Sequence, residues 1–498
     1  MKNTYPVFKY TSLDSPVIYH QNRVISLGEL LETVDYLSGI IPDRQHLLNL
    51  YEDRYYFLLG FLVSLKQQSL SLFPSTITDH VLCHLSSQYS NILVLSDKKM
   101  SPAQFEIFDL KDLLKDIDFS EYSSTGKATG QSLSSKTLAV LPDISLTREV
   151  AVIFTSGSTG DPKPYIKQWR DLTVAAQHLS EQLFINTSLS GESILPALLA
   201  TVPAQHMYGL EVSIILALQN GFLIHSNKPF FPQDITHCLQ DLSSEAHQRG
   251  QIIETTLITA PLHIKACIKT QVALPGIKQF ISATAPLDIE LAQNCEHRYS
   301  APVMEVFGCT EVGSMAIRQS TETEQWLLLK DISLERIKNN NSNQNEVQIN
   351  TSRSIKQFLF NDIIELIDQQ HFILKGRKDD LINLAGKRTS LAYLNHHLQS
   401  YDELADACFY LDSVVRDNVV KDKKVEDKNQ LIAFVVLNTP DSIENKQMIK
   451  NIRAYLQQRI ETIFLPKKIF FVASLPRNAT GKLPQSGLKE LMQEQRLK

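Results

Sequence analysis

The chain has 498 residues, of which 43% are hydrophobic and 21% charged, and its formal net charge is −5. This length is too great for one ordinary hydrophobic core, so two or more domains are expected. The composition is that of a soluble globular protein, and the slight acidity excludes the basic field on which nucleic-acid binding depends. The start, MKNTYPVFKY, has no apolar core of a signal peptide, so the cytoplasm is the expected location.

The N-terminal part shows a weak alternation of strand, helix and strand in HLLNLY, DRYYFLLGFLVSLKQQ and SLSLFP. The longest apolar run, YYFLLGFLVSL, is too short to span a bilayer and predicts a buried helix, so no transmembrane segment is expected. The six cysteines are scattered without a CxxC pair, which argues against a zinc site and against a disulfide framework. The polar residues 97–147 give no assignment.

Between about Val150 and Phe307, short apolar runs alternate with helical patterns. The runs VAVIF, GFLIHS, TTLITA, IKQFIS and APVMEVF are bounded by turn residues, as buried strands are. The segments WRDLTVAAQHLSEQL, PLHIKACI and PLDIELAQNCEHR carry apolar residues at helical spacing. This alternation predicts an α/β fold, with mostly parallel sheets covered by helices.

Three unusual loops follow predicted strands, at Thr155–Lys163, Ser282–Pro286 and Gly308–Gly313. In open parallel sheets, ligands bind at the carboxyl ends of the strands. We therefore expect these loops to contribute to one composite site.

The chain changes character after QQHFILKGRKDD, where it becomes more charged and shows a pattern of helix, strands, helix and strand. We expect a large N-terminal domain over residues 1–376 and a small α+β C-terminal domain over residues 377–498. Two polar stretches, KNNNSNQNE and VVRDNVVKDKKVEDKNQ, predict a turn or hairpin tip and a hairpin loop, respectively.

The loop TSGSTGDPK, which ends at Lys163, has the composition of an anion site. Backbone N–H groups in a Gly/Ser/Thr loop after a strand form a nest for phosphate, and a lysine adds a point charge. A P-loop needs G-x-x-x-x-G-K-[ST], whereas here the lysine lies between Pro162 and Pro164 and cannot open a helix. A P-loop enzyme is disfavoured, and a Ser/Gly turn without a ligand is the plain alternative.

Further motifs follow in order: VPAQHMYGLE, ISATAPL, VFGCTEVG, NDIIEL, GRKDDLINLAGKRTSL and LPRNATGKLP. Together with TSGSTGDPK they resemble the motifs of the adenylate-forming enzymes, which include acyl- and aryl-CoA synthetases, adenylation domains of peptide synthetases and luciferases. The resemblance runs from about Ala151 to Pro484. It implies that ATP activates a carboxylic acid to an acyl-adenylate, and that the thiol of CoA or of a carrier-protein phosphopantetheine then displaces AMP.

The resemblance also implies roles for single residues. Lys482 would bridge the attacking carboxylate and the α-phosphate, and Glu311 would hold Mg²⁺. The C-terminal domain would be mobile and would rotate about a hinge at Asp379, which brings the loop around Gly386 to the thiol channel. The other ATP contacts would come from Thr155, Ser156, Gly157, Ser158, Thr159, Gly160 and Lys163 at the outer phosphates, Thr310 at the α-phosphate, Phe307 and Gly308 at adenine, and Asp362 and Arg377 at ribose.

The resemblance also places an acyl pocket. Its walls would be His206, Met207, Tyr208, Gly209, Ala283, Val306 and Met315. This small, apolar and partly aromatic set suits a flat aryl acid or a short acyl group. The segments TVPAQHMYGLE and FLPKKIFFVASLPRNATGKLP resemble those of the adenylating enzymes of aryl polyene pigment pathways. This resemblance implies an aromatic acid as substrate and an acyl carrier protein as partner.

Each assignment has a plainer alternative. Glu311 fits an acid at a helix N-terminus, Asp362 an ordinary turn residue, and His206 a core histidine. Lys482 fits a solvated loop lysine. The chain also departs from the family pattern at Phe307 (usually Tyr), Asn361 (usually Gly), Thr389 (often Ile) and Gln485 (commonly Arg).

Other functions stay open at this point. An amino-acid-adenylating enzyme would need an anionic residue near the start of the acyl pocket, and none is apparent in the sequence. A non-catalytic scaffold that binds nucleotide or carrier protein would be favoured if Lys482 or Glu311 were missing, and both are present. Luciferase-like oxygen chemistry shares the adenylation step and is compatible with the same motifs.

Overall fold

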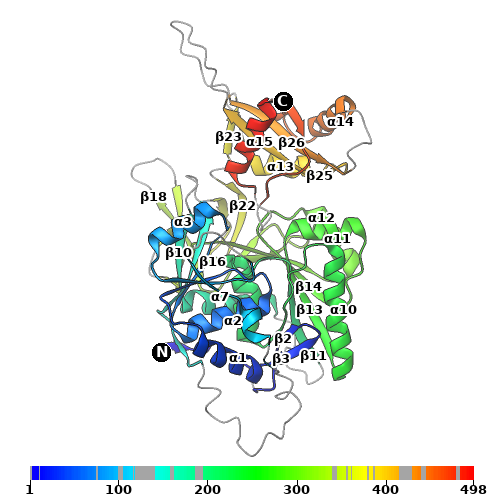
Figure 1. Cartoon of the computed structure of the whole chain (residues 1–498). Helices are drawn as coiled ribbons and strands as arrows, with labels where there is room; N and C mark the ends of the chain where they lie inside the picture. The colour runs from blue at the N-terminus through cyan, green and yellow to red at the C-terminus, as the bar shows by residue number, and fades with distance from the viewer. Residues whose placement is uncertain are drawn as a thin grey trace, which may run out of the picture. The chain divides into compact units, whose positions relative to one another are not determined.

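The computed structural model describes two compact units of the chain (Figure 1). The first comprises mainly Met1–Phe358, and the second comprises Leu359–Asp368, Phe372–Asn478 and Lys482–Lys498. The predicted domain boundary at 376/377 falls inside the second unit and stays a prediction. The described residues are 3–10, 12–74, 77–98, 105–115, 117, 141–156, 162–184, 194–338, 345–354, 357–360, 362–377, 381–384, 387–413, 429–438, 445–477 and 483–497.

One sheet of the large unit carries the strand that precedes the Ser/Gly loop. Its strand order is β10 (Pro162–Gln168), β9 (Glu149–Ser156), β5 (Leu70–Phe73), β4 (His46–Asn49), β6 (Ile92–Leu95) and β7 (Glu106–Phe108). All neighbours are parallel except β10, which runs antiparallel to β9. The sequence analysis did not predict β10. Its prolines are tolerated because an edge strand can leave a missing N–H on its open side.

A second sheet carries the other two loops. Within the large unit its order is β17 (Trp326–Leu328), β16 (Gly313–Gln319), β15 (Val303–Cys309), β14 (Ile277–Ser282), β13 (Ile252–Thr259), β11 (Ile194–Ala200), β12 (Leu223–His225), β2 (Pro16–His20) and β3 (Arg23–Ser26). The strands from β15 to β2 are parallel, and β16, β17 and β3 join antiparallel. The three loops therefore follow strands of two sheets rather than one.

Helices cover these sheets as their apolar faces require. Figure 1 shows α10, α11 and α12 side by side, and Ile235, Ile264 and Ala292 pack onto Leu257 and Phe280 of the sheet. The predicted apolar helix is confirmed as α2, which is buried on all sides. The helices of the unit are α1 (Leu27–Ile40), α2 (Arg54–Lys66), α3 (Asp79–Gln88), α4 (Leu110–Leu114), α7 (Trp169–Leu183), α8 (Met207–Gly209), the π-helix η1 (Leu210–Ile215), α9 (Leu216–Asn220), α10 (Pro232–Arg249), α11 (Pro261–Thr270) and α12 (Ile289–Tyr299).

The small unit has its own α+β core. Alternate residues of β26 face opposite sides, so Ala433 and Val435 pack against α13 and α14, whereas Ile432 and Phe434 pack against α15. This confirms the α/β class with a smaller α+β unit. The elements are β21 (Asp362–Leu366), β22 (His371–Arg377), β23 (Leu381–Leu384), β24 (Lys387–Ser390), α13 (Leu391–Gln399), β25 (Leu404–Ser413), β26 (Asn429–Leu437), α14 (Asn445–Gln457), the 3₁₀ helix η2 (Thr462–Phe464), β27 (Lys468–Phe471) and α15 (Gln485–Leu497).

Both predicted hairpins have paired strands on either side. β18 (Ile332–Lys338) pairs antiparallel with β19 (Asn345–Thr351), and β25 pairs antiparallel with β26. The tips themselves lie outside the described residues. A short pair, β1 (Thr4–Tyr5) with β8 (Ile144–Ser145), and β20 (Phe358–Leu359) complete the strands. Among the described residues, no helix is both long and apolar enough to cross a membrane.

A buried ion pair ties the segment after β19 to the core of the large unit. The Arg353 guanidinium is 1% exposed and donates to both carboxylate oxygens of Asp331, at 2.7 and 2.8 Å.

Because removing one partner of such a pair leaves an uncompensated buried charge, Arg353→Met should lower the free energy of unfolding by about 3–5 kcal/mol in urea denaturation. The exposed pair Arg44–Glu106 offers the control: Arg44→Met should cost at most about 1 kcal/mol. Equal losses in the two variants would contradict this interpretation.

Candidate active site

The Ser/Gly loop joins two antiparallel strands, with Thr155 opposite Lys163 in the β9–β10 register. Lys163 is therefore a strand residue and opens no helix, as the sequence predicted when a P-loop was disfavoured. The chain of the loop from Gly157 to Gly160, with Ser158 and Thr159, lies outside the described residues, as do Lys482, Asp379 and Gly386. Their assigned roles stay predictions.

The Thr310–Glu311 segment is a tight turn between antiparallel β15 and β16, with Cys309 opposite Gly313. The alternative that Glu311 is an acid at a helix N-terminus is therefore wrong. Two glycines make the turn this tight. A Cβ on Gly308 would lie 2.3 Å from the Gly313 carbonyl oxygen, and Gly313 itself has φ +92°, a conformation that other residues avoid.

The structure brings Lys163 and Glu311 together although they belong to different sheets. Tyr165 is the residue that both approach: the Lys163 ammonium group lies over its ring, and the charges of Lys163 and Glu311 both act on its phenol. The Lys163 nitrogen is 5.3 Å from the centroid of the Tyr165 ring. Contact with the phenol and the Glu311 charge raises the pKa of Lys163, so this lysine is cationic. An exposed cation beside a carboxylate can bind phosphate and a hard metal ion at one place.

A buried carboxyl group also holds this turn in place. Glu211 of η1 is fully buried and accepts hydrogen bonds from the backbone N–H of Ser314 at 2.9 Å and from its hydroxyl at 2.7 Å. Arg353 donates to the carbonyl oxygen of Ser314 at 2.7 Å. The other Glu211 oxygen, Oε1, has no hydrogen-bond partner among the described residues and would lie 2.2 Å from a Cβ on Gly313. Any side chain at Gly313 would thus displace Glu211.

Two of the predicted acyl-pocket residues lie at the ends of β13 and β14. The Tyr208 hydroxyl donates to the Ile281 carbonyl oxygen at 2.8 Å, and the Ala283 N–H donates to the Thr259 carbonyl oxygen at 3.3 Å. Burial raises the pKa of Tyr208, which therefore stays a neutral donor. The remaining members are Met207, Gly209, Val306 and Met315, which are buried, and His206, which is half-buried before α8.

Two backbone positions in this region are tightly constrained. A Cβ on Gly209 would lie 1.9 Å from the Pro203 carbonyl oxygen, so only glycine fits there. Thr284, in the predicted loop after β14, has φ +76°, which is a true outlier for a β-branched residue. Strain of this kind persists only where the surroundings impose it, and it marks the loop for a functional role.

The predicted adenine residue has aromatic support. The Phe307 ring is half-buried and lies 5.4 Å from the Trp326 ring, which in turn is covered by the Arg318 guanidinium at 4.4 Å. In the small unit, Asp362 and Arg377 are cross-strand partners of the β21–β22 hairpin, so the two predicted ribose residues do lie side by side. Asp362 begins a strand rather than occupying an ordinary turn.

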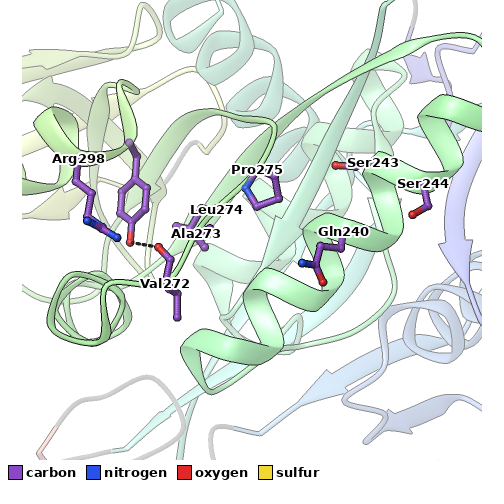
Figure 2. A pocket seen from close by; sticks show the side chains of 9 residues that line it. Gln240, Ser243, Ser244, Val272, Ala273, Leu274, Pro275 and Arg298 are labelled. Carbon is purple, nitrogen blue, oxygen red and sulfur yellow. Dashed lines mark hydrogen bonds between the residues drawn. The ribbon is translucent and has the colours of Figure 1, made fainter.

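A separate groove of about 750 Å³ lies on the large unit (Figure 2). It is lined by Gln240, Ser243 and Ser244 of α10, residues 272–275, and Arg298 and Tyr299 of α12. The Tyr299 hydroxyl donates to the Val272 carbonyl oxygen at 3.2 Å. Residues 272–275 precede β14, whereas the predicted loop follows it, so the groove lies at the opposite edge of the sheet and we assign it no role.

Tyr165, Lys167, Glu211 and Arg353 were missed in the sequence analysis. Their contacts join segments far apart along the chain, and no short motif contains them. The one available signal was Gly313, since a glycine two residues after a Thr-Glu pair between two predicted strands indicates a turn with special backbone geometry.

The two units, the Ser/Gly hairpin and the acidic turn together have the architecture of an adenylate-forming enzyme. The model of the family described as AMP-binding enzyme matches residues 86–342, more than half of the chain, and that of the AMP-binding enzyme C-terminal domain matches residues 413–482. The chain therefore belongs to the AMP-binding enzyme family.

The chain is similar to ligases that act on different acids. A 4-coumarate–CoA ligase of Halorhodospira halophila is 23% identical over 66% of this chain and 73% of its own length. A D-alanine–D-alanyl carrier protein ligase of Lacticaseibacillus paracasei is 22% identical over 96% of this chain and 98% of its own length. The fold is similar to that of an O-succinylbenzoate coenzyme A synthetase from Bacillus subtilis solved with ATP and magnesium ion, with a TM-score of 0.72, 15% identity, and coverage of 96% of this chain and 97% of that one.

The buried Glu211 gives a pH-dependent prediction. Burial raises the pKa of Glu211 above its ordinary value of 4.5, although Arg353, Ser314 and Lys167 oppose the shift. The folded state therefore binds more protons than the unfolded state between the two pKa values, and stability falls as pH rises through that range. The variant Glu211→Gln has no titrating group at this position. The free energy of unfolding of the variant minus that of wild type should therefore rise with pH from about 4.5 upward.

Urea denaturation over a pH series measures this difference. The exposed Glu322 provides the control, since Glu322→Gln should differ from wild type by a nearly constant amount. A pH-independent difference for Glu211→Gln as well would show that its carboxyl group titrates alike in both states.

Proposed function

We propose that the protein is an AMP-forming acid–thiol ligase. It activates a carboxylic acid with ATP to an acyl-adenylate and pyrophosphate, and then transfers the acyl group to a thiol. The family assignment carries this proposal, and the electrostatic interaction of Lys163 and Tyr165 with Glu311 supports it at the residue level. The predicted roles of the loop residues, of Lys482 and of the Asp362–Arg377 pair are part of the proposal.

The residues near Glu311 fit a magnesium ion that arrives with ATP. Among the described residues, no three His, Cys, Asp or Glu side chains are grouped to hold a metal by themselves. Mg²⁺ commonly uses one or two carboxylates together with substrate phosphates. Glu311 would supply the carboxylate, and Lys163 would neutralise phosphate charge beside it. The metal would supply charge stabilisation at the phosphates.

We propose an aromatic acid as substrate, and an acyl carrier protein as acceptor, in the manner of aryl polyene pathways. The apolar pocket walls and the resemblance of the flanking segments support this choice over a polar acid.

The similarity to a D-alanine ligase supports amino-acid activation as the second candidate. Glu211 is a buried acid three residues after Tyr208, but it is bound to Ser314 and lies against Gly313, which disfavours it as a partner for a substrate amino group. The six free thiols suit the cytoplasm, which we propose as the location.

Pyrophosphate release from Mg·ATP tests the proposal. A panel should contain hydroxycinnamates, hydroxybenzoates, short and medium fatty acids, and amino acids including D-alanine. We expect release with an aryl acid, followed by acyl transfer when CoA or a phosphopantetheinylated carrier protein is added. Release with D-alanine alone would favour the second candidate. Binding of ATP without release for any acid would favour the scaffold function.

Lys482→Ala should separate the two half-reactions. If Lys482 bridges the carboxylate and the α-phosphate, its loss should slow adenylation by about 10²-fold or more, while transfer from a supplied acyl-adenylate continues. Single-turnover assays of each step measure this separation. The exposed Lys489 of α15 is a matched control, and Lys489→Ala should leave both steps unchanged. Normal adenylation by Lys482→Ala would overturn the assigned role.

A further inference from the structure

One face of the edge strand β10 is directed at the acidic turn. Side chains alternate along a strand, so Lys163, Tyr165 and Lys167 share one face while Ile166 faces the other side. Their burial increases along the strand: Lys163 is exposed, Tyr165 is half-buried and Lys167 is 1% exposed. The strand thus runs from the exposed Lys163 into the interior beside Glu311.

All three side chains interact with Glu311, each in a different way. The Lys167 ammonium group donates to the Glu311 carbonyl oxygen at 2.8 Å. The Tyr165 phenol and the Lys163 ammonium group act on the Glu311 carboxylate electrostatically. The backbone of Glu311 is therefore held by a hydrogen bond from β10, and its carboxylate lies within electrostatic reach of two further side chains of the same strand.

Lys167 is unusual because its charge is buried without a direct carboxylate partner. In the described part of the chain, its one hydrogen bond goes to the Glu311 carbonyl, and Asp171 and Glu211 stabilise its charge only from a distance. If stability alone mattered, a well-packed apolar residue at this position would stabilise the folded state at least as well. The charge is therefore better explained by what it holds, which is the backbone of the turn.

We propose that Tyr165 and Lys167 are positioning residues, which hold the metal-binding Glu311 at a set place relative to the phosphate-binding Lys163. The inference rests on the proposed function, since it deepens the account of the Mg·ATP site. Lys167 sets the turn backbone, and Tyr165 sets the direction of the carboxylate. Neither residue is required to contact the reacting atoms.

Nucleotide binding with and without Mg²⁺ tests the inference independently of turnover. Calorimetry with Mg·ATP should show binding about tenfold weaker for Lys167→Met, the scale expected when a charged group loses its hydrogen bond, and weaker by a smaller factor for Tyr165→Phe. Binding of ATP in EDTA should change by less than about twofold. In turnover, KM for Mg·ATP should rise while KM for the acid stays the same.

Ile166→Ala is the matched control, because it changes the opposite face of the same strand and should leave both affinities unchanged. Lys167→Met could lose its fold, which thermal denaturation would reveal, and Tyr165→Phe then decides the question. Folded variants that bind Mg·ATP as wild type does would overturn the inference, and so would equal weakening with and without Mg²⁺. Failure of the wild type to release pyrophosphate would overturn the proposed function instead, while the binding data still judge the positioning role.

Discussion

The hydrogen bond from the buried Lys167 ammonium group to the Glu311 carbonyl joins the two largest sheets of the large unit, between β10 of one and the turn after β15 of the other. β10 and the Ser/Gly loop belong to one sheet, whereas the acidic turn belongs to the other. A site shared by two sheets is only as well defined as the contact between them. Because Lys167 lies on the strand that carries Lys163, this contact links the proposed phosphate side of the site to its proposed metal side.

The turn itself is held by charges that would be costly elsewhere. Glu211 and Arg353 are both buried, and they bind the Ser314 N–H and carbonyl from opposite sides. Burying such groups rarely adds net stability, but it disfavours any other conformation of the turn, since each alternative leaves a buried polar group without its hydrogen bond. Gly308 and Gly313 leave room for these contacts, because a side chain at either position would collide with the partner strand or with Glu211.

Much of the fold could be predicted from the sequence, because the strands and helices between Val150 and Phe307 follow the periodicity of buried secondary structure. The strand β10 could not, since two prolines and two lysines in seven residues argue against a strand until its place at a sheet edge is known. Short motifs located Glu311, Lys163 and the acyl-pocket segment. They could not locate Glu211 or Arg353, whose partner Ser314 is distant along the chain, and whose signal is a three-dimensional contact rather than a local pattern.

The segment from Met207 to Ile215 links the two ends of the proposed site. Tyr208 hydrogen-bonds the ends of β13 and β14 beside the acyl pocket, and Glu211, three residues later on the same helical stretch, binds the acidic turn. Residues three apart lie on one side of a helix, and π-helical turns such as η1 recur at functional sites because they redirect side chains without ending the helix. The proposed wall of the acyl pocket and the carboxyl group that binds the acidic turn are therefore parts of one continuous helical stretch, so the position of one constrains the position of the other.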